Sequence, residues 1–231
     1  ERAEKSWIKA YELDPKNYAT LWGLSFHYLL RGNLQKSNIY LSKLKEMNFE
    51  LADDYALEGW YNFYGKNNIE ASIPYFKKTI TRSSNPKQFQ YWIVWYDLLY
   101  AMGKSQKCDE IDNLNFKNIW LEFENKERDR IAEKIYFAYV EFFCNSNSNI
   151  LEEFNDDEFM LESRPNNYEY YFYTKIILLL ESGEIEEALS IIENGYVFAK
   201  THYYSFLRHP ALLPLKDNQR FQKILSRASM E

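Results

Sequence analysis

The chain has 231 residues, a net charge of −6, and a composition that is 46% hydrophobic and 18% aromatic. This composition predicts a large core, whereas 7 Gly and 6 Pro are too few turn residues for a many-stranded sandwich or barrel. The acidic balance, with no run of Lys or Arg longer than two, argues against a nucleic-acid surface. The longest strongly apolar run covers residues 176–180 and is far shorter than the ~20 residues of a membrane-spanning helix.

The first part of the chain, residues 3–44, has apolar and small residues at steps of three and four. The spaced positions are Ala3, Trp7, Ala10, Leu21, Leu24, Tyr28, Gly32, Ser37, Leu41 and Leu44. Such steps predict helices that each pack one narrow stripe against a partner helix. Gly32 lies where the chain must reverse between two of them. With no initiator Met and no signal peptide, residues 3–13 are expected to be the second helix of a repeat cut from a longer protein.

This pattern resembles the tetratricopeptide repeat (TPR) family, whose unit is a helix-turn-helix of about 34 residues. The resemblance implies an all-α, right-handed solenoid. A partial repeat covers residues 1–16, and repeats follow at about 18–49, 51–84, 87–115, 116–165 (degenerate) and 166–200. Further turns are expected at residues 65–68, at Gly103, at residues 145–149, which include no Gly, and at Gly183. Ser72, Phe76 and Thr79 are expected to pack the second helix of the second repeat.

The C-terminal segment, residues 201–231, differs from the repeats and is expected to cap the array. Its Pro210–Pro214 turn and its Arg220-Phe221 helix resemble the segment that follows TPR arrays in bacterial winged-helix transcriptional regulators and adenylate-cyclase-like signalling proteins. An apolar cap is expected on physical grounds as well, because the last repeat of an array leaves one face uncovered. The resemblance implies that the chain belongs to a larger bacterial regulatory protein, with a function in signalling and transcription regulation.

In the TPR family the first helix of each repeat lines a concave groove that binds partners. Side chains off the packing stripe of those helices are therefore the predicted partner-binding residues: Trp22, Phe26, Tyr61, Tyr64, Asp97, Tyr100, Tyr170 and Tyr173, together with Leu29, Leu57, Ile93 and Ile177. Aromatic residues of this kind suit the anchors of a peptide or an amphipathic helix. The competing interpretation is that Trp22 and Tyr61 belong to the core.

No pattern of catalytic or metal-binding residues is evident in the sequence. The acidic residues between Glu152 and Glu162 lack the Gly of a calcium loop and suit a solvated helix face. The three His show no ligand spacing, and there is no nucleophile elbow or phosphate loop. Cys108 and Cys144 are expected to be buried free thiols, with a disulfide as the alternative. We therefore expect no enzyme activity, no metal and no cofactor.

The sequence thus predicts a non-catalytic protein–protein interaction or sensing domain that binds a protein or peptide in the groove. Neither nucleic acid nor membrane is expected to bind this domain. One alternative is a self-association module, a homodimer formed through Trp60, Trp92, Trp95 or Trp120. Another is a small-molecule sensor with an aromatic pocket. A cytoplasmic location is favoured, and a periplasmic one is expected if the parent protein is a membrane-bound regulator.

Overall fold

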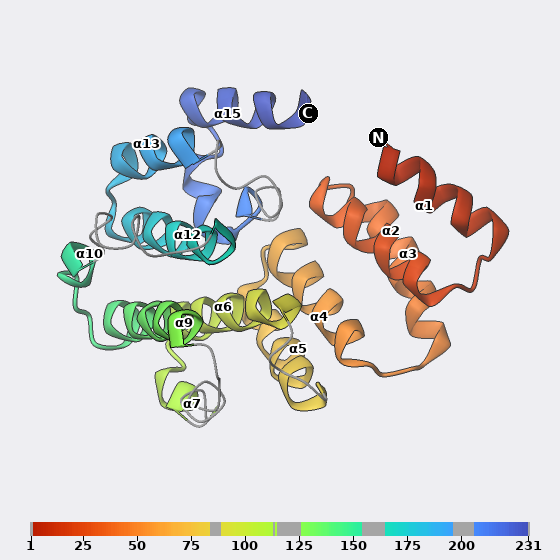
Figure 1. The fold of residues 1–231 in the computed structure, drawn as a ribbon, viewed down its shortest axis with the longest axis horizontal. Helices are drawn as coiled ribbons and strands as arrows, with labels where there is room; N and C mark the ends of the chain where they lie inside the picture. Colours follow the sequence, from red (N-terminus) through yellow and green to blue (C-terminus); the bar gives the residue numbers. More distant parts are fainter. Residues whose placement is uncertain are drawn as a thin grey trace. The chain divides into compact units, whose positions relative to one another are not determined.

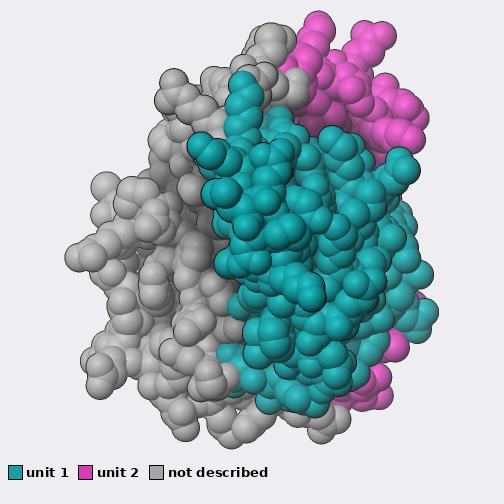
Figure 2. Space-filling model, turned by 90° about the vertical axis from the view of Figure 1, so that its right-hand side faces the viewer, with its two compact units in different colours: residues 1–98 teal, residues 99–231 magenta. Residues whose placement is uncertain are grey.

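A computed structural model describes residues 2–83, 89–112, 114, 126–153, 165–195 and 206–230. Every regular element in these ranges is a helix, and the ranges contain no strand, which confirms the all-α class (Figure 1). The chain forms two compact units, residues 1–98 and 99–231, shown in separate colours in Figure 2. This division falls inside helix α6 (Phe89–Lys104), whereas the domain boundary predicted from sequence lies at residue 200.

Unit 1 consists of helices joined by short turns. They are α1 (Arg2–Leu13), α2 (Tyr18–Leu30), α3 (Leu34–Met47), α4 (Ala52–Trp60), the π-helical segment η1 (Tyr61–Gly65), α5 (Ile69–Arg82) and the first part of α6. Helix α2 packs against α1 and α3, and α4 with η1 packs against α5 (Figure 1). Asn17, Asn33 and Asn68 precede α2, α3 and α5, and each side chain accepts a hydrogen bond from a first-turn amide. These Asn caps fix where the three helices begin.

The predicted packing stripes form the core of unit 1. Leu21, Leu24, Tyr28, Leu41 and Leu44 are all buried, as are Ser72, Phe76 and Thr79 of α5. The steps of three and four therefore identified the inward faces of these helices correctly.

Two buried serines join α2 to α3. The Ser25 hydroxyl donates to the Ser37 carbonyl (3.0 Å), and the Ser37 hydroxyl donates to the Ser25 carbonyl (2.8 Å). A buried hydroxyl is costly unless it is hydrogen-bonded, and this reciprocal pair satisfies both. Ser37, one of the positions that the spacing predicted to pack, is thus accommodated by a second serine on the facing helix.

Unit 2 contains the rest of α6 and a second set of helices. They are α7 (Cys108–Asp112), α9 (Lys126–Tyr139), the π-helical segment η2 (Val140–Cys144), α10 (Ile150–Glu153), α12 (Pro165–Ser182), α13 (Ile185–Gly195), the 3₁₀ segment η3 (Pro210–Leu215) and α15 (Gln219–Met230). Helix α12 packs against α9, α13 and η3, and α13 also packs against α15. The predicted capping segment therefore supplies two elements, which bury Leu212, Phe221 and Ile224.

Five inter-helix turns share one backbone device, a single residue with positive φ, whereas the turn between α3 and α4 has two such residues, Asn48 and Glu50. The five single residues are Gly32, Asn67, Gln106, Ser146 and Gly183, with φ between 51° and 90° and spacings of 35, 39, 40 and 37 residues. In each of these five turns the following amide bonds back to a carbonyl near the end of the preceding helix, as in helix C-caps of this kind. The predicted turns at residues 65–68 and 145–149 contain Asn67 and Ser146, whereas Gly65 ends η1 and Gly103 lies inside α6.

A different glycine, Gly59 of α4, is required by close packing. A Cβ added there would lie 2.4 Å from the ring of Phe76, which is fully buried on α5. Such a distance forces the ring or the helix to move, and overpacking of this kind typically costs 1–3 kcal/mol.

We therefore expect Gly59→Ala to lower the free energy of unfolding by about 1–3 kcal/mol. If helix propensity alone mattered, the substitution would instead raise the free energy of unfolding by about 0.5–1 kcal/mol. The sign of the change therefore distinguishes overpacking from propensity. Urea unfolding of Gly59→Ala, Phe76→Leu and the double variant measures it. The smaller residue at position 76 should recover part of the loss in the double variant. A more stable Gly59→Ala protein would contradict the packing argument.

Candidate functional site

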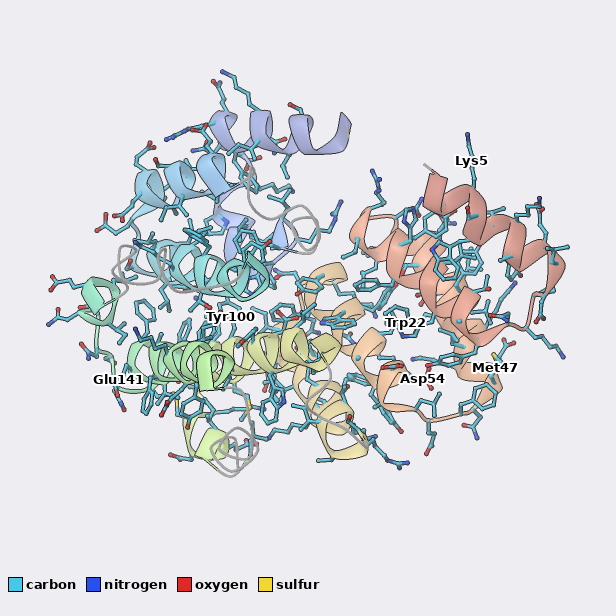
Figure 3. All side chains as sticks on the ribbon, in the orientation of Figure 1. Lys5, Trp22, Met47, Asp54, Tyr100 and Glu141 are labelled. Atoms are coloured by element: carbon cyan, nitrogen blue, oxygen red, sulfur yellow. A yellow bond between two sulfur atoms is a disulfide. The ribbon has the colours of Figure 1, made fainter. Side chains whose placement is uncertain are left out.

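A pocket of about 300 Å³ lies in unit 1, between α1, α2 and α4. Eight residues line it: Trp7, Tyr18, Ala19, Trp22, Gly23, Asp53, Ala56 and Trp60. Four of the eight are aromatic, and the volume is at the lower end of the range for small-ligand sites. Trp22, one of the predicted partner-binding residues, is labelled in Figure 3.

The tryptophans reach the pocket because the helices present small residues beside them. Gly23 on α2 lies against the ring of Trp7, whose carbons would be 2.8–2.9 Å from an added Cβ. The Trp22 ring lies 5.1 Å from that of Phe26 and 6.5 Å from that of Trp60, and Phe26 and Trp60 are 5.2 Å apart. These centroid distances are those of mutually attractive aromatic pairs, so the three rings form one cluster.

Hydrogen bonds fix three of the pocket rings. The indole Nε1 of Trp22 donates to the Asp53 carbonyl (3.1 Å), and that of Trp60 donates to the Asp97 carboxyl group (2.9 Å). The Tyr18 hydroxyl donates to Asp54 (2.8 Å), which also accepts the Leu51 amide and so opens α4. The polar atoms of these rings are therefore bonded to protein acceptors.

Three of the predicted partner-binding residues are half-buried in unit 1. Trp22 and Phe26 belong to the aromatic cluster on α2. Tyr61 lies on η1, with the Lys66 ammonium 5.1 Å from its ring centroid. All three combine packing contacts with exposed surface, a mixture that neither the groove nor the core interpretation foresaw.

Tyr64 and Asp97 are buried and bind each other. The Tyr64 hydroxyl donates to Asp97 Oδ2 (2.7 Å), the same oxygen that accepts from Trp60. Burial raises the pKa of Asp97 to about 7, against the opposing effect of these two hydrogen bonds. Leu29 and Leu57 are also buried, while Ile93 is half-buried. These buried side chains support the site from within unit 1 and present no surface to a partner.

The other predicted residues belong to unit 2. Tyr100 is buried, and its hydroxyl donates to Glu181 (2.9 Å); burial is the main cause that raises its pKa. Tyr173 is half-buried and stacks on Phe206 at 4.1 Å, and Ile177 is buried. The side chain of Tyr170 lies outside the described residues. The predicted set is thus divided between the two units, and only Trp22 lines the pocket.

His209 also lies in the core of unit 2. Its ring is 4.6 Å from that of Tyr100, and Nδ1 accepts the Ala211 amide (3.2 Å) at the start of η3. Burial lowers the pKa of His209 to about 3, so the ring is neutral at physiological pH. The hydrogen bond from the Ala211 amide shows that the His209 side chain caps the start of η3.

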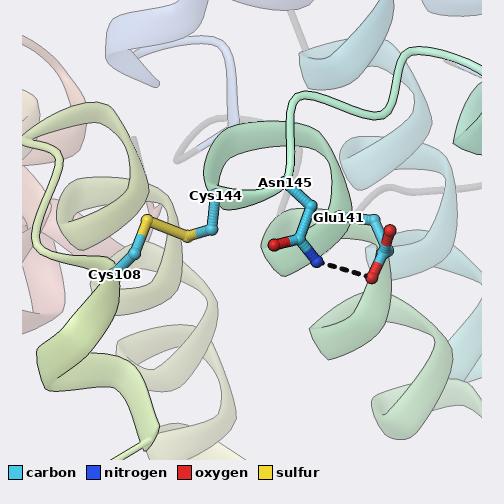
Figure 4. The surroundings of a disulfide bond; sticks show 4 residues. All are labelled: Cys108, Glu141, Cys144 and Asn145. Carbon is cyan, nitrogen blue, oxygen red and sulfur yellow. Dashed lines mark hydrogen bonds between the residues drawn. A yellow bond between two sulfur atoms is a disulfide. The ribbon is translucent and has the colours of Figure 1, made fainter.

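Cys108 and Cys144 form a disulfide, so the prediction of free thiols was wrong (Figure 4). Their Cα atoms are 5.7 Å apart, the usual separation for a disulfide. Cys108 opens α7, and Cys144 ends η2, beside the turn in which the Glu141 carboxylate accepts hydrogen bonds from Asn145 and Asn147. The bond therefore fixes the end of one helix to the start of another, across 36 residues.

Some sequence predictions fall outside the described residues. These include Trp120, the Trp92 side chain and most of the acidic stretch that ends at Glu162. Within the described parts of the chain, no three His, Cys, Asp or Glu residues are grouped as a metal site would require. Nor is any helix there long and apolar enough to cross a membrane.

Comparison with protein-family models, with curated proteins and with solved structures finds no match to this chain. The pocket therefore has to be interpreted from its own geometry. Sequence analysis missed Trp7, Tyr18, Asp53 and Trp60 as lining residues. Trp7 was assigned to a packing stripe and Trp60 to a dimer contact, and only the packing of α1 and α4 against α2 brings them to one pocket.

Proposed function

We propose that this chain is a non-catalytic interaction domain that binds a peptide or partner segment through the pocket of unit 1. The observation that carries the proposal is the concentration of aromatic side chains around that pocket. Trp, Tyr and other large, rigid side chains dominate binding energy at protein interfaces. Trp22 and Phe26 retain exposed surface next to the pocket, so an incoming side chain has contacts both inside it and at its edge.

The proposed architecture is a right-handed solenoid of TPR-like repeats. The five turns with a single positive-φ residue, at spacings of 35 to 40 residues, support it, because a regular period is the signature of repeat proteins. The packing of η3 and α15 on α12 and α13 supports a terminal cap. A role in a larger bacterial regulatory protein, one that functions in transcription, is proposed on the resemblance of the C-terminal segment.

The disulfide bears on the proposed compartment. Disulfides form and persist in oxidising environments and are rare in the cytosol. A bond between Cys108 and Cys144 therefore favours the periplasmic alternative over the cytoplasmic one.

Peptide selection by display against the full chain tests the proposed function. We expect enriched peptides to lose at least tenfold in affinity for Trp22→Ala, since truncation of a central aromatic contact typically costs ~2 kcal/mol. Ala19→Leu, at an exposed position that lines the pocket, should weaken the same peptides while leaving the helix intact. Phe137→Ala removes an exposed aromatic side chain of unit 2 and is the matched control.

Unfolding curves for each variant separate binding from folding. A peptide set that binds wild type and both pocket variants equally would exclude the pocket as the binding site. If binding is lost only in variants that are unfolded, the role of Trp22 is structural and the residue does not contact the peptide.

A small-molecule sensor is the second candidate, favoured by the volume of the pocket. Self-association through tryptophans has less support, because Trp60 and Trp95 are both buried.

A further inference from the structure

We propose that the pocket of unit 1 binds a poorly hydrated organic cation of the quaternary-ammonium class. This inference rests on the proposed function and specifies the chemistry of the group that enters the pocket. The same chemistry occurs in a small solute such as choline and in a trimethylated lysine side chain.

The first step is the aromatic wall. Trp7, Tyr18, Trp22 and Trp60 contribute rings from three helices to one pocket of about 300 Å³. The face of an aromatic ring carries negative electrostatic potential and attracts cations, most strongly for Trp. Pockets formed by several such rings are the usual means by which proteins recognise quaternary ammonium groups.

The second step is the charge. Asp53 is the one acidic residue among the eight that line the pocket, and the eight include no Lys, Arg or His. A carboxylate at an aromatic pocket adds direct attraction for a cation and repels an anion. A lining that includes an acidic residue and no basic one favours a cation over an anion.

The third step concerns hydrogen-bond donors. The indole N–H of Trp22 and of Trp60 and the hydroxyl of Tyr18 each donate to a protein acceptor. These three rings consequently offer aromatic carbon to a ligand rather than a polar hydrogen. An anion would need several donors in place of its water, and a primary ammonium would need several acceptors. A quaternary ammonium has no N–H to satisfy, so it matches the pocket best.

The test is a titration of the full chain with choline, followed by tryptophan fluorescence and calorimetry at constant ionic strength. The neutral carbon isostere 3,3-dimethylbutan-1-ol has the same shape and no charge, and is the matched ligand control. We expect choline to bind at least fivefold more tightly than the isostere. Equal affinity, or no binding of choline, would overturn the inference.

Protein variants locate the binding. Asp53→Asn removes the charge but keeps the backbone carbonyl that holds Trp22, so it should weaken choline about fivefold and leave the isostere unchanged. Glu46→Gln removes an equal charge at an exposed position on α3 and should change neither. Ala19→Leu should weaken both ligands by filling the pocket. An Asp53→Asn protein that binds choline as wild type does would contradict the assigned role of the carboxylate.

A third ligand, N-acetyl-trimethyllysine amide, identifies the source of the cation. Tighter binding than choline indicates a modified peptide side chain, and weaker binding indicates a small solute; both outcomes support the cation. If choline does not bind while displayed peptides still depend on Trp22, the cation inference fails and the proposed function stands.

Discussion

Reduction of the Cys108–Cys144 disulfide is expected to lower the free energy of unfolding by about 4 kcal/mol. The chain-entropy relation for a closed loop gives this magnitude for a sequence separation of 36 residues. The bond links α7 to η2, and both elements are short.

Urea unfolding of the oxidised chain, the reduced chain and the Cys108→Ser/Cys144→Ser variant measures the effect. The last two should agree with each other, because both lack the crosslink and keep a small polar side chain. Digestion without reductant should release one peptide pair joined by the disulfide. Rapid reaction of two thiols with a thiol reagent in the native, non-reduced protein would show that the bond is absent.

The pair also shows why sequence analysis favoured free thiols. Two cysteines give no spacing pattern. Their separation of 36 residues does not indicate whether the two thiols lie close together until the positions of the helices are known. The separation is close to the spacing of the turns, so Cys108 and Cys144 occur near comparable points of consecutive helix pairs. Recognition of that period at Gln106 and Ser146, which are not glycines, would have brought the two cysteines together.

The turns themselves were located well, but their key residues were not. Glycine was taken as the marker of positive φ, and this holds at Gly32 and Gly183. In the turns after η1 and η2 the π-helical ends add a residue, and Asn67 and Ser146 take the left-handed conformation. Both residues lie inside the predicted turns, at 65–68 and 145–149. Asn tolerates this conformation best after glycine, so Asn67 could have been named within its turn, whereas Ser146, which is flanked by two Asn, could not.

Helix α6 explains why Asp97 and Tyr100 were assigned to a surface. The assignment assumed one packed stripe and one open face, as in α3, where Ser37, Leu41 and Leu44 are buried and their neighbours are exposed. Residues 94–103 of α6 are buried on every side. A helix that is apolar all round has no open face, and its spacing cannot distinguish a groove from a core.

The buried carboxyl group of Asp97 is expected to make stability depend on pH. Because burial raises the pKa of Asp97 from 3.8 to about 7, the folded chain holds this proton more tightly than the unfolded chain does. The contribution of Asp97 is fully present below pH 3.8 and is lost as the pH rises toward 7. The loss amounts to about 4 kcal/mol for a pKa difference of this size. Asp97→Asn keeps an oxygen for Trp60 and Tyr64 but cannot ionise, so it should escape the loss.

The free energy of unfolding of wild type and Asp97→Asn, measured from pH 4 to pH 8, isolates this effect because every other group titrates in both proteins. The difference should shift steadily in favour of the variant up to about pH 7 and then become constant. Tyr64→Phe provides a second check, since its hydroxyl donates to Asp97 and lowers the pKa of that group. Without the bond the pKa should rise further, and the loss of stability should extend above pH 7. A difference between wild type and Asp97→Asn that stays constant over the whole range would mean that Asp97 ionises as freely in the folded chain as in the unfolded one.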